Sequence, residues 1–161
     1  MKKVIVIGCP GSGKSTFSKH LHKATGLPLF HLDMLYWNPD KTTVDKTVFS
    51  VRLADVLQKE AWSIDGNYRS TLETRLERCD TVFFLDYPLE LCLNGIKSRK
   101  GKPRSDMPWI ETEEDKELLG FVERYSSDCR PHVLSLLDGC WDKDIYIFKS
   151  RQEADSFLQH L

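Results

Sequence analysis

Short apolar runs and longer segments of helical periodicity alternate along this chain. Five runs have the length and composition of β-strands, and they cover Lys3–Ile7, Leu27–Leu32, Ala61–Ile64, Thr81–Leu85 and Asp144–Phe148. The run at Thr81–Leu85 is almost wholly apolar, as is typical of a parallel strand that is covered on both faces. We therefore expect a five-stranded sheet with helices packed on it.

Segments with helical features separate these runs. Apolar residues recur near the helical period between about Asp45 and Glu60, and Ser150 with Glu153 forms a capping box for a terminal helix. Further helices are predicted at about 13–25, 71–78 and 88–99. Strands that alternate with helices predict a parallel, doubly wound α/β fold.

One segment, from Lys100 to about Asp142, interrupts this alternation. It begins with a turn-rich basic stretch, Gly101-Lys102-Pro103-Arg104, and continues through an acidic run at Glu111–Glu117, with one or two predicted helices. An insertion before the last strand is where a mobile cover could lie over a ligand. No repeat or low-complexity linker divides the chain, so we expect one domain over residues 1–161.

Composition narrows the classes of function. The 161 residues include 23 Lys plus Arg and 24 Asp plus Glu, so no general polyanion-binding surface is implied. The five cysteines are widely spaced and contain no Cys-x-x-Cys pair, which argues against a zinc site or a disulfide framework and fits reduced thiols. No apolar stretch is long enough to span a bilayer. We expect a soluble, cytoplasmic protein with no membrane partner; a monomer fits the sequence, which leaves the oligomeric state open.

A phosphate-binding motif follows the first apolar run. Residues 8–15 read Gly-Cys-Pro-Gly-Ser-Gly-Lys-Ser, the P-loop pattern GxxxxGK[ST], between a predicted strand and a predicted helix. Successive backbone N–H groups of such a loop point at phosphate oxygens, and the helix N-terminus adds positive potential. We expect Lys14 to reach the β- and γ-phosphates of ATP, Ser15 to hold Mg²⁺ and Thr16 to contact the α-phosphate. The predicted cofactor-binding residues of this motif are Gly8, Cys9, Pro10, Gly11, Ser12, Gly13, Lys14, Ser15 and Thr16.

Three aspartates follow other predicted strands. In an open parallel sheet the carboxyl ends of the strands meet at a ligand-binding edge, which would carry Asp33, Asp65 and Asp86 beside the P-loop. Asp33 could accept a proton from an acceptor hydroxyl, or it could be a strand-end turn residue. Asp65 could hold Mg²⁺ through water and contact the substrate, or it could belong to an ordinary Asp-Gly turn. Asp86 is better explained as a cap of the next helix.

Arginines supply the remaining candidate cations. Arg69 could bind an acceptor phosphate with a bidentate fork, although a solvated arginine explains it almost as well. Arg99 and Arg104 flank the basic stretch that opens the inserted segment. Their predicted role is that of lid cations, which close on the phosphates and stabilise the transition state. The alternative is a nucleic-acid patch, which the balanced charge of the chain disfavours.

The chain resembles the adenylate-kinase-like P-loop kinases and, more closely, the bacterial family called DNA topology modulation proteins, or FlaR-like proteins. The closer resemblance runs essentially end to end and is carried by His31-Leu32-Asp33 with Tyr36-Trp37, by Asp65-Gly66-Asn67-Tyr68-Arg69 and by Arg104-Ser105-Asp106-Met107-Pro108. It implies a three-layer P-loop NTPase fold whose five parallel strands lie in the order 2-3-1-4-5. It also implies an acceptor-binding section at about residues 33–60 and a short helical lid at about 100–125.

The resemblance further implies roles for single residues. Arg69 occupies the place of an arginine that binds the acceptor phosphate, although Asn67-Tyr68 replaces the apolar-Pro pair usual in those kinases. Arg99 occupies the place of a lid-base arginine, and Arg104 with Asp106 resembles the Arg-x-Asp of the lid. After the last predicted strand, Arg151 occupies the place of the adenine-contacting loop. The short lid and the atypical acceptor section argue against AMP as the acceptor and leave ATP as the expected donor.

Together these features predict phosphoryl transfer, dependent on ATP and Mg²⁺, from the P-loop to a small acceptor. A nucleotide or nucleoside-like acceptor is favoured, with Lys14, Asp33, Arg99 and Arg104 as catalytic residues. One alternative is a kinase for a small hydroxy acid, such as a sugar acid or a shikimate-like molecule. Another is a nucleotide-responsive regulator that acts on DNA or a protein partner. The chain has no helix-turn-helix, zinc finger or basic stripe, so a nucleic-acid partner is not expected.

Overall fold

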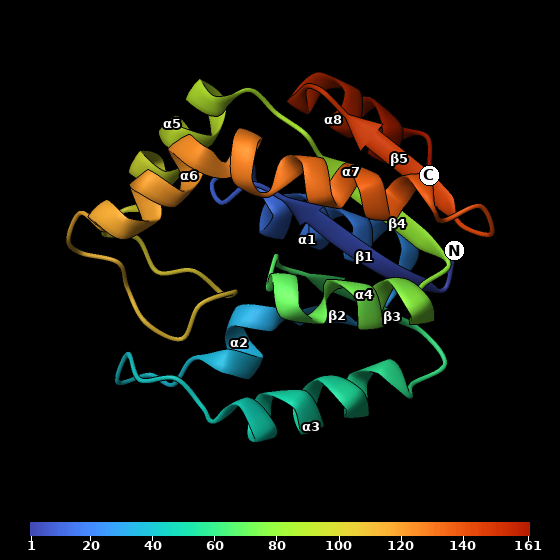
Figure 1. The fold of residues 1–161 in the computed structure, drawn as a ribbon, viewed down its shortest axis with the longest axis horizontal. Coiled ribbons are helices and arrows are strands. Elements are labelled where there is room, and N and C mark those ends of the chain that lie inside the picture. The colour runs from blue at the N-terminus through green and yellow to red at the C-terminus, as the bar shows by residue number, and fades with distance from the viewer.

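Residues 1–161 of the computed structural model form a parallel sheet flanked by helices (Figure 1). Its five strands are β1 (Lys3–Gly8), β2 (Leu29–His31), β3 (Trp62–Asp65), β4 (Thr81–Leu85) and β5 (Asp144–Phe148). They lie in the order β2-β3-β1-β4-β5, and every neighbouring pair is parallel. The predicted α/β class, strand number and strand order are confirmed, and the strand that leads into the P-loop is central.

Eight helices connect the strands: α1 (Lys14–Thr25), α2 (Leu32–Tyr36), α3 (Lys46–Leu57), α4 (Arg69–Arg78), α5 (Leu89–Arg99), α6 (Lys116–Asp128), α7 (Arg130–Asp138) and α8 (Arg151–Gln159). Side chains of α1 and α8 pack on one face of the sheet, and those of α3, α4 and α7 pack on the other, which gives three layers. No helix combines the length and the apolar character that crossing a membrane requires.

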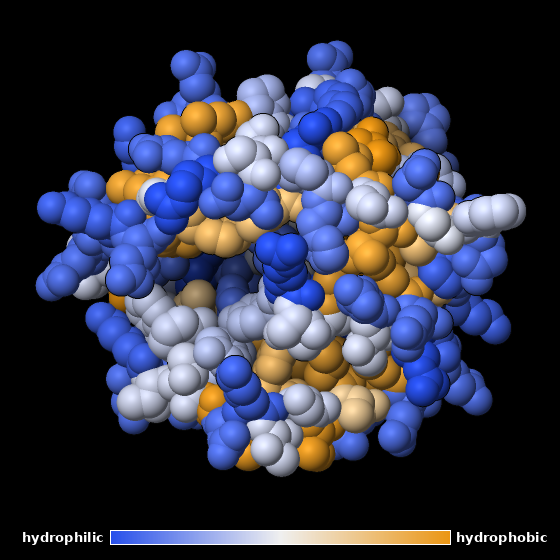
Figure 2. All heavy atoms as spheres, in the orientation of Figure 1, coloured by the Kyte–Doolittle hydropathy of each residue, from blue (hydrophilic) through white to orange (hydrophobic).

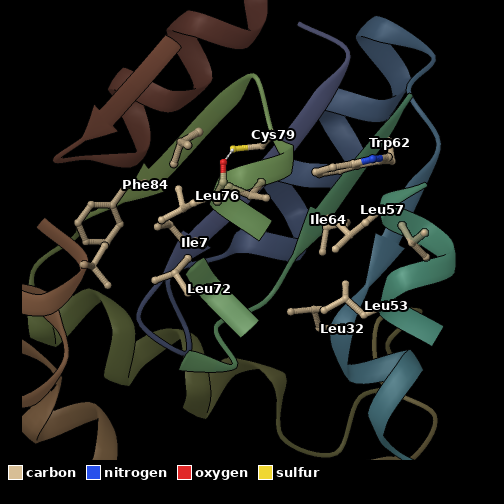
Figure 3. Packing of buried hydrophobic residues seen from close by; sticks show 14 of the residues in the cluster. Ile7, Leu32, Leu53, Leu57, Trp62, Ile64, Leu72, Leu76, Cys79 and Phe84 are labelled. Carbon is tan, nitrogen blue, oxygen red and sulfur yellow. Dashed lines mark hydrogen bonds between the residues drawn. The ribbon is translucent and has the colours of Figure 1, made fainter. Parts of the chain in front are cut away.

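Alternating side chains of β1 divide the hydrophobic core in two. Ile5 and Ile7 belong to the larger cluster, while Val4 and Val6 belong to the cluster beneath α1 and α8. Figure 3 shows the larger cluster, in which Ile7 lies beside side chains of α4. All four β1 side chains are at most 2% exposed. Burying each such branched side chain contributes about 1.5–3 kcal/mol, so the strand that carries the P-loop is firmly anchored.

The second strand is shorter than predicted, and the residue expected at its end lies in a helix. β2 ends at His31, and Asp33 is the second residue of α2. Leu32 and Leu35 both pack against the larger core cluster, and side chains three residues apart share a face only in a helix. The backbone N–H of Trp37 then donates to the carbonyl of Asp33 (2.9 Å), which closes the turn. Asp33 therefore reaches the site from a helix, not from a strand end.

The lid predicted over residues 100–125 is helical only from Lys116 onward, because residues 100–115 form a loop. Gly101 has a φ of 73°, and Pro103 and Pro108 lack the N–H that a helix needs at these positions. Helical structure begins only with α6 at Lys116, where the side chain of Asp115 accepts a hydrogen bond from the backbone N–H of Leu118 (3.0 Å). The cover over the site is therefore a long loop followed by a helix.

Candidate functional site

A cavity of about 810 Å³ opens at the carboxyl edge of the sheet. Its walls come from the P-loop, the loop after β3, the end of α5, the 103–111 loop and the start of α8. Figure 2 shows the hollow below α6, with hydrophilic side chains deep inside it. Because the strands are parallel, the segments that follow them meet at this one edge.

The P-loop forms the floor of the cavity. Residues Pro10–Thr16 all line it, whereas Gly8 and Cys9 do not. Gly11 and Gly13 have φ values of 81° and 92°, a left-handed conformation that glycine adopts at little cost. The loop therefore presents backbone instead of side chains at these two positions, as a phosphate cradle requires.

Lys14 lies against its own loop. Its ammonium group donates to the carbonyl oxygens of Gly8 (2.9 Å) and Cys9 (3.2 Å). Burial lowers the pKa of Lys14, and the nearby charge of Asp65 acts in the opposite direction. A half-buried cation without a carboxylate in contact is poised to exchange these weak carbonyl partners for the stronger acceptor oxygens of a phosphate.

Two glycines allow the P-loop to touch α5. A Cβ atom on Gly95 would lie 2.0 Å from the carbonyl oxygen of Gly11, and one on Gly11 would lie 2.0 Å from the carbonyl oxygen of Cys92. Atoms cannot approach so closely, and both neighbours are backbone, which cannot rotate away as a side chain can. The close approach of α5 thus fixes the position of the P-loop.

We expect the substitution Gly95→Ala to weaken Mg·ATP binding at least tenfold. Alanine in a helix interior normally stabilises by about 1 kcal/mol, but here the clash reverses the sign and costs about 1–3 kcal/mol of unfolding free energy. Gly120→Ala in α6 is the matched control, because its Cβ would meet only the flexible guanidinium of Arg124 at 3.1 Å. Titration calorimetry and denaturant unfolding would measure both variants. Equal behaviour of the two would show that the contact does not constrain the loop.

Asp65 lies at the end of β3 and is 3% exposed. The Nδ1 atom of His31, the last residue of β2, lies 2.9 and 2.8 Å from its two carboxylate oxygens. Burial alone would lower the pKa of His31, but the hydrogen bond and the charge of Asp65 outweigh it and raise that pKa. His31 therefore orients the Asp65 carboxylate, a role that the sequence motifs did not indicate.

Ser15 and Asp106 connect the P-loop to the covering loop. The Ser15 hydroxyl donates to Asp106 Oδ2 at 2.7 Å, and Asp106 is 5% exposed. Burial would raise the pKa of Asp106, but the hydrogen bond from Ser15 and the charge of Arg104 lower it, so it is a carboxylate at neutral pH. Asp106 was not among the predicted site residues, although it lies in the Arg104–Pro108 run that carries the family resemblance.

The oxygen atoms around Ser15 fit a magnesium ion. Mg²⁺ prefers oxygen ligands and is usually held by one or two carboxylates together with substrate phosphates and water. The Ser15 hydroxyl and the carboxylates of Asp65 and Asp106 all line the cavity and supply such atoms. No cluster of three or more His, Cys, Asp or Glu side chains forms a cage for a metal. The donor set thus suits a metal that arrives with a nucleotide.

Asp33 faces the same cavity from α2. Its Oδ1 atom accepts a hydrogen bond from the hydroxyl of Tyr68 at 2.6 Å. Burial raises the pKa of Asp33, against the opposing effects of the Tyr68 hydrogen bond and the charge of Lys14. A carboxyl group with a raised pKa is a better proton acceptor when it is ionised.

Glu111 forms ion pairs with both of the predicted lid arginines. Arg99 donates to both carboxylate oxygens of Glu111, at 2.9 and 3.1 Å. Arg104 lies 3.4 Å from Glu111 and 3.6 Å from Asp106. Glu111 was not predicted as a site residue; its only sequence signal was its place at the start of the acidic run. Both arginines line the cavity, but in this arrangement their charges are neutralised by carboxylates.

Of three other residues considered from the sequence, one lines the cavity and two lie outside it. Arg151 lines the cavity at the first turn of α8. Arg69 is exposed and does not line the cavity, because Tyr68 takes a left-handed conformation (φ 34°) and turns toward Asp33 just before α4 begins. Asp86 does not cap α5; it binds Arg130 at 2.8 Å through each carboxylate oxygen.

A buried arginine supports the loop after β3. Arg75 of α4 is 0% exposed, and its guanidinium donates to the carbonyl oxygens of Gly66 (3.0 Å), Asn67 and Tyr68. Burial without a carboxylate partner lowers the pKa of Arg75 to about 10. Its sequence signal was weak: it is a charged residue beside Leu76 on the core-facing side of a short helix.

Several solved structures of kinases have a fold similar to that of this chain. Neither a protein-family model nor a curated protein matches this sequence. Shikimate kinase from Bacteroides thetaiotaomicron superposes with a TM-score of 0.65 at 18% identity, over 98% of this chain and 94% of that chain. Shikimate kinase from Acinetobacter baumannii in complex with shikimate superposes with a TM-score of 0.66 at 16% identity, over 99% of this chain and 92% of that chain. A gluconokinase from Sinorhizobium meliloti 1021 superposes with a TM-score of 0.58 at 16% identity, over 99% of this chain and 92% of that chain.

This chain shares the fold of these kinases. The match extends over nearly the whole length of both compared chains. At such low identity the likeness concerns the fold, and the chemistry of the site has to be argued from its own residues.

Proposed function

We propose that this protein transfers the γ-phosphoryl group of ATP, with Mg²⁺, to a hydroxyl group of a small acceptor. The observation that carries the proposal is that a phosphate-binding loop and the Asp33 carboxylate face one cavity. Phosphoryl transfer mainly requires positioning and neutralisation of charge, and this cavity supplies groups for both.

Each residue of the site has a role in this proposal. The P-loop amides and Lys14 bind the phosphates, and Asp33 accepts the proton of the acceptor hydroxyl. Ser15, Asp65 and Asp106 would hold Mg²⁺, which supplies charge neutralisation to the transferred group when it is bound.

The remaining roles concern the two ends of the ATP molecule. Arg99 and Arg104 are released from Glu111 to face the phosphates, and Arg151 contacts the nucleoside of ATP. The acceptor role of Arg69 requires its exposed side chain to turn toward the cavity, so we leave that residue out of the proposed site.

The class of acceptor is a nucleotide or nucleoside-like molecule, with a small hydroxy acid as the alternative. The structural neighbours named for shikimate kinase and gluconokinase activity lend support to the second class. We also propose membership of the bacterial DNA topology modulation family and a cytoplasmic location, on the sequence resemblance alone. The regulator hypothesis is weaker, because Arg99 and Arg104 of the basic stretch pair with acids and leave only exposed lysines there.

Phosphorus NMR with Mg·ATP and a panel of nucleosides, nucleotides, sugars and hydroxy acids tests this proposal. We expect one class to yield ADP and a new phosphate ester, and Asp33→Asn to lower that yield about 100-fold without weakening Mg·ATP binding. The exposed residue Asp55 gives a matched control, Asp55→Asn.

The same Asp33→Asn variant has a predicted effect on stability. Because burial raises the pKa of folded Asp33 above its unfolded value, the folded state holds the proton more tightly, and stability falls as pH rises between those two values. At pH 7 the variant should therefore be at least as stable as the parent.

Absence of any phosphoryl transfer by the parent protein, together with DNA binding at physiological salt, would favour the regulator hypothesis instead.

A further inference from the structure

The strand order divides the cavity into two ends. Asp33 and Asp65 follow β2 and β3 on one side of the central β1, whereas Tyr87 and Arg151 follow β4 and β5 on the other. The P-loop lies between them. Since the proposed function puts the nucleoside of ATP near Arg151, the acceptor occupies the end that contains Asp33.

Carboxylates dominate this acceptor end. Asp33 and Asp65 line the cavity at this end, Asp106 binds Ser15 of the adjoining P-loop, and Asp65 and Asp106 are almost fully buried. Asp33 forms no ion pair, and its side chain accepts its one hydrogen bond from the neutral hydroxyl of Tyr68. A second anion placed beside Asp33 would therefore meet a negative charge that no ion pair neutralises.

The nearby cations are already engaged or lie in solvent. Glu111 binds both Arg99 and Arg104, and those two arginines are the groups that face the phosphates of ATP in the proposed reaction. Lys14 belongs to the P-loop, and Lys19 is exposed on α1, where water and salt screen its charge. Of these groups, only Lys14 is neither exposed nor paired with a carboxylate, and in the proposed reaction the phosphates of ATP occupy it.

The acceptor end has aromatic walls. Trp37 and Trp109 both line the cavity, with ring centroids 5.5 Å apart and planes at 73°. The indole N–H of Trp109 is buried without a hydrogen-bond partner. The exposed Lys41 lies over the Trp109 ring, 5.3 Å from its centroid. Aromatic faces bind flat or ring-shaped molecules, and a free indole N–H can donate to a neutral oxygen.

We infer that the acceptor is an uncharged ring that bears a hydroxyl group and carries no phosphate or carboxylate. This inference rests on the proposed function and narrows it. In the reaction the acceptor oxygen bonds to the γ-phosphorus, and the bond from that phosphorus to the β,γ-bridging oxygen breaks. ADP departs with the bonding electrons, and Asp33 takes the proton of the hydroxyl. An acceptor with its own negative charge would lose its hydration at this end without gaining a cation.

Pairs of related acceptors, one neutral and one anionic, test the inference. The assay uses the full chain with Mg·ATP and detects the product by mass spectrometry. The pairs are adenosine with AMP, glucose with glucuronate, and shikimate methyl ester with shikimate. The first pair represents nucleosides, and the other two represent sugars and cyclitols. The panel therefore shows which of these two classes of ring the protein phosphorylates. We expect kcat/KM for the neutral member of the accepted pair to exceed that of its anionic partner at least 100-fold.

Preference for an anionic member would overturn the inference and leave the proposed phosphoryl transfer intact. Failure of all six compounds would also overturn it, because the neutral class would then have been represented without reaction. The proposed function would then be tested separately with acceptors of other classes. Consumption of ATP that requires both such an acceptor and Lys14 would support it, and no such consumption would contradict it.

The variant Glu111→Gln tests the source of the discrimination. It removes the carboxylate that neutralises Arg99 and Arg104 while keeping the size of the side chain, so kcat/KM for the anionic member should rise about tenfold relative to the neutral one. Glu114→Gln, at an exposed position of the same acidic run, is the control and should leave the ratio unchanged. An unchanged ratio in Glu111→Gln would overturn the role given to these ion pairs.

Discussion

Replacing Lys14 with methionine is expected to lower phosphoryl transfer about 1,000-fold and to leave the protein folded. Loss of one preorganised group that stabilises transition-state charge typically costs 100- to 1,000-fold in turnover, and Lys14 is the sole lysine of the cavity floor. Methionine retains the length and the apolar stem of lysine, so the packing beneath the loop changes little. The measured quantities would be kcat for ADP formation and the affinity for Mg·ATP.

Folding of this variant should be nearly normal. The two hydrogen bonds of Lys14 go to backbone carbonyls, and their loss is offset because a half-buried cation no longer has to be partly desolvated. We expect the unfolding free energy to change by about 1 kcal/mol or less. Lys23→Met, at an exposed position of the same helix, controls for the loss of a positive charge. Equal turnover in the two variants would remove Lys14 from the mechanism.

Replacing Arg75 with methionine is expected to lower the unfolding free energy by about 3 kcal/mol. The guanidinium is fully buried and donates to three successive carbonyl groups of the loop after β3, which would be left without partners. That loop also provides the Asn67 side chain, which accepts from the backbone N–H of Gly8 at 3.3 Å, and the Tyr68 hydroxyl that binds Asp33. We therefore expect turnover to fall together with stability.

Two variants separate the causes of this loss. Arg75→Lys keeps the positive charge but has only one nitrogen, which cannot reach all three carbonyls, so it should recover less than half of the lost free energy. Arg78→Met, at an exposed position of the same helix, should change stability by less than about 0.5 kcal/mol. Urea unfolding of the three variants would test this order. A stability of Arg75→Met equal to that of the parent would show that the loop does not depend on the guanidinium.

The sequence by itself determined the features that are local. β1 and β4 are almost wholly apolar runs, and the P-loop is a contiguous motif whose glycines, lysine and serine are recognised by their spacing. Alternation of strands and helices was enough to predict the parallel α/β sheet, and the family resemblance supplied its order. These predictions succeeded because short-range patterns of burial and turn formation decide them.

Only the tertiary structure decided which polar groups meet. Ser15 binds Asp106 across 91 positions of sequence, and Arg75 supports the loop after β3 from the interior of a helix. Arg69, which the motif assigned to the acceptor, remains outside the cavity because the backbone turns at Tyr68. Glu111 neutralises both Arg99 and Arg104, although no spacing in the chain links the three. Such pairings depend on how elements pack and on which charges burial forces together, and a linear pattern carries neither.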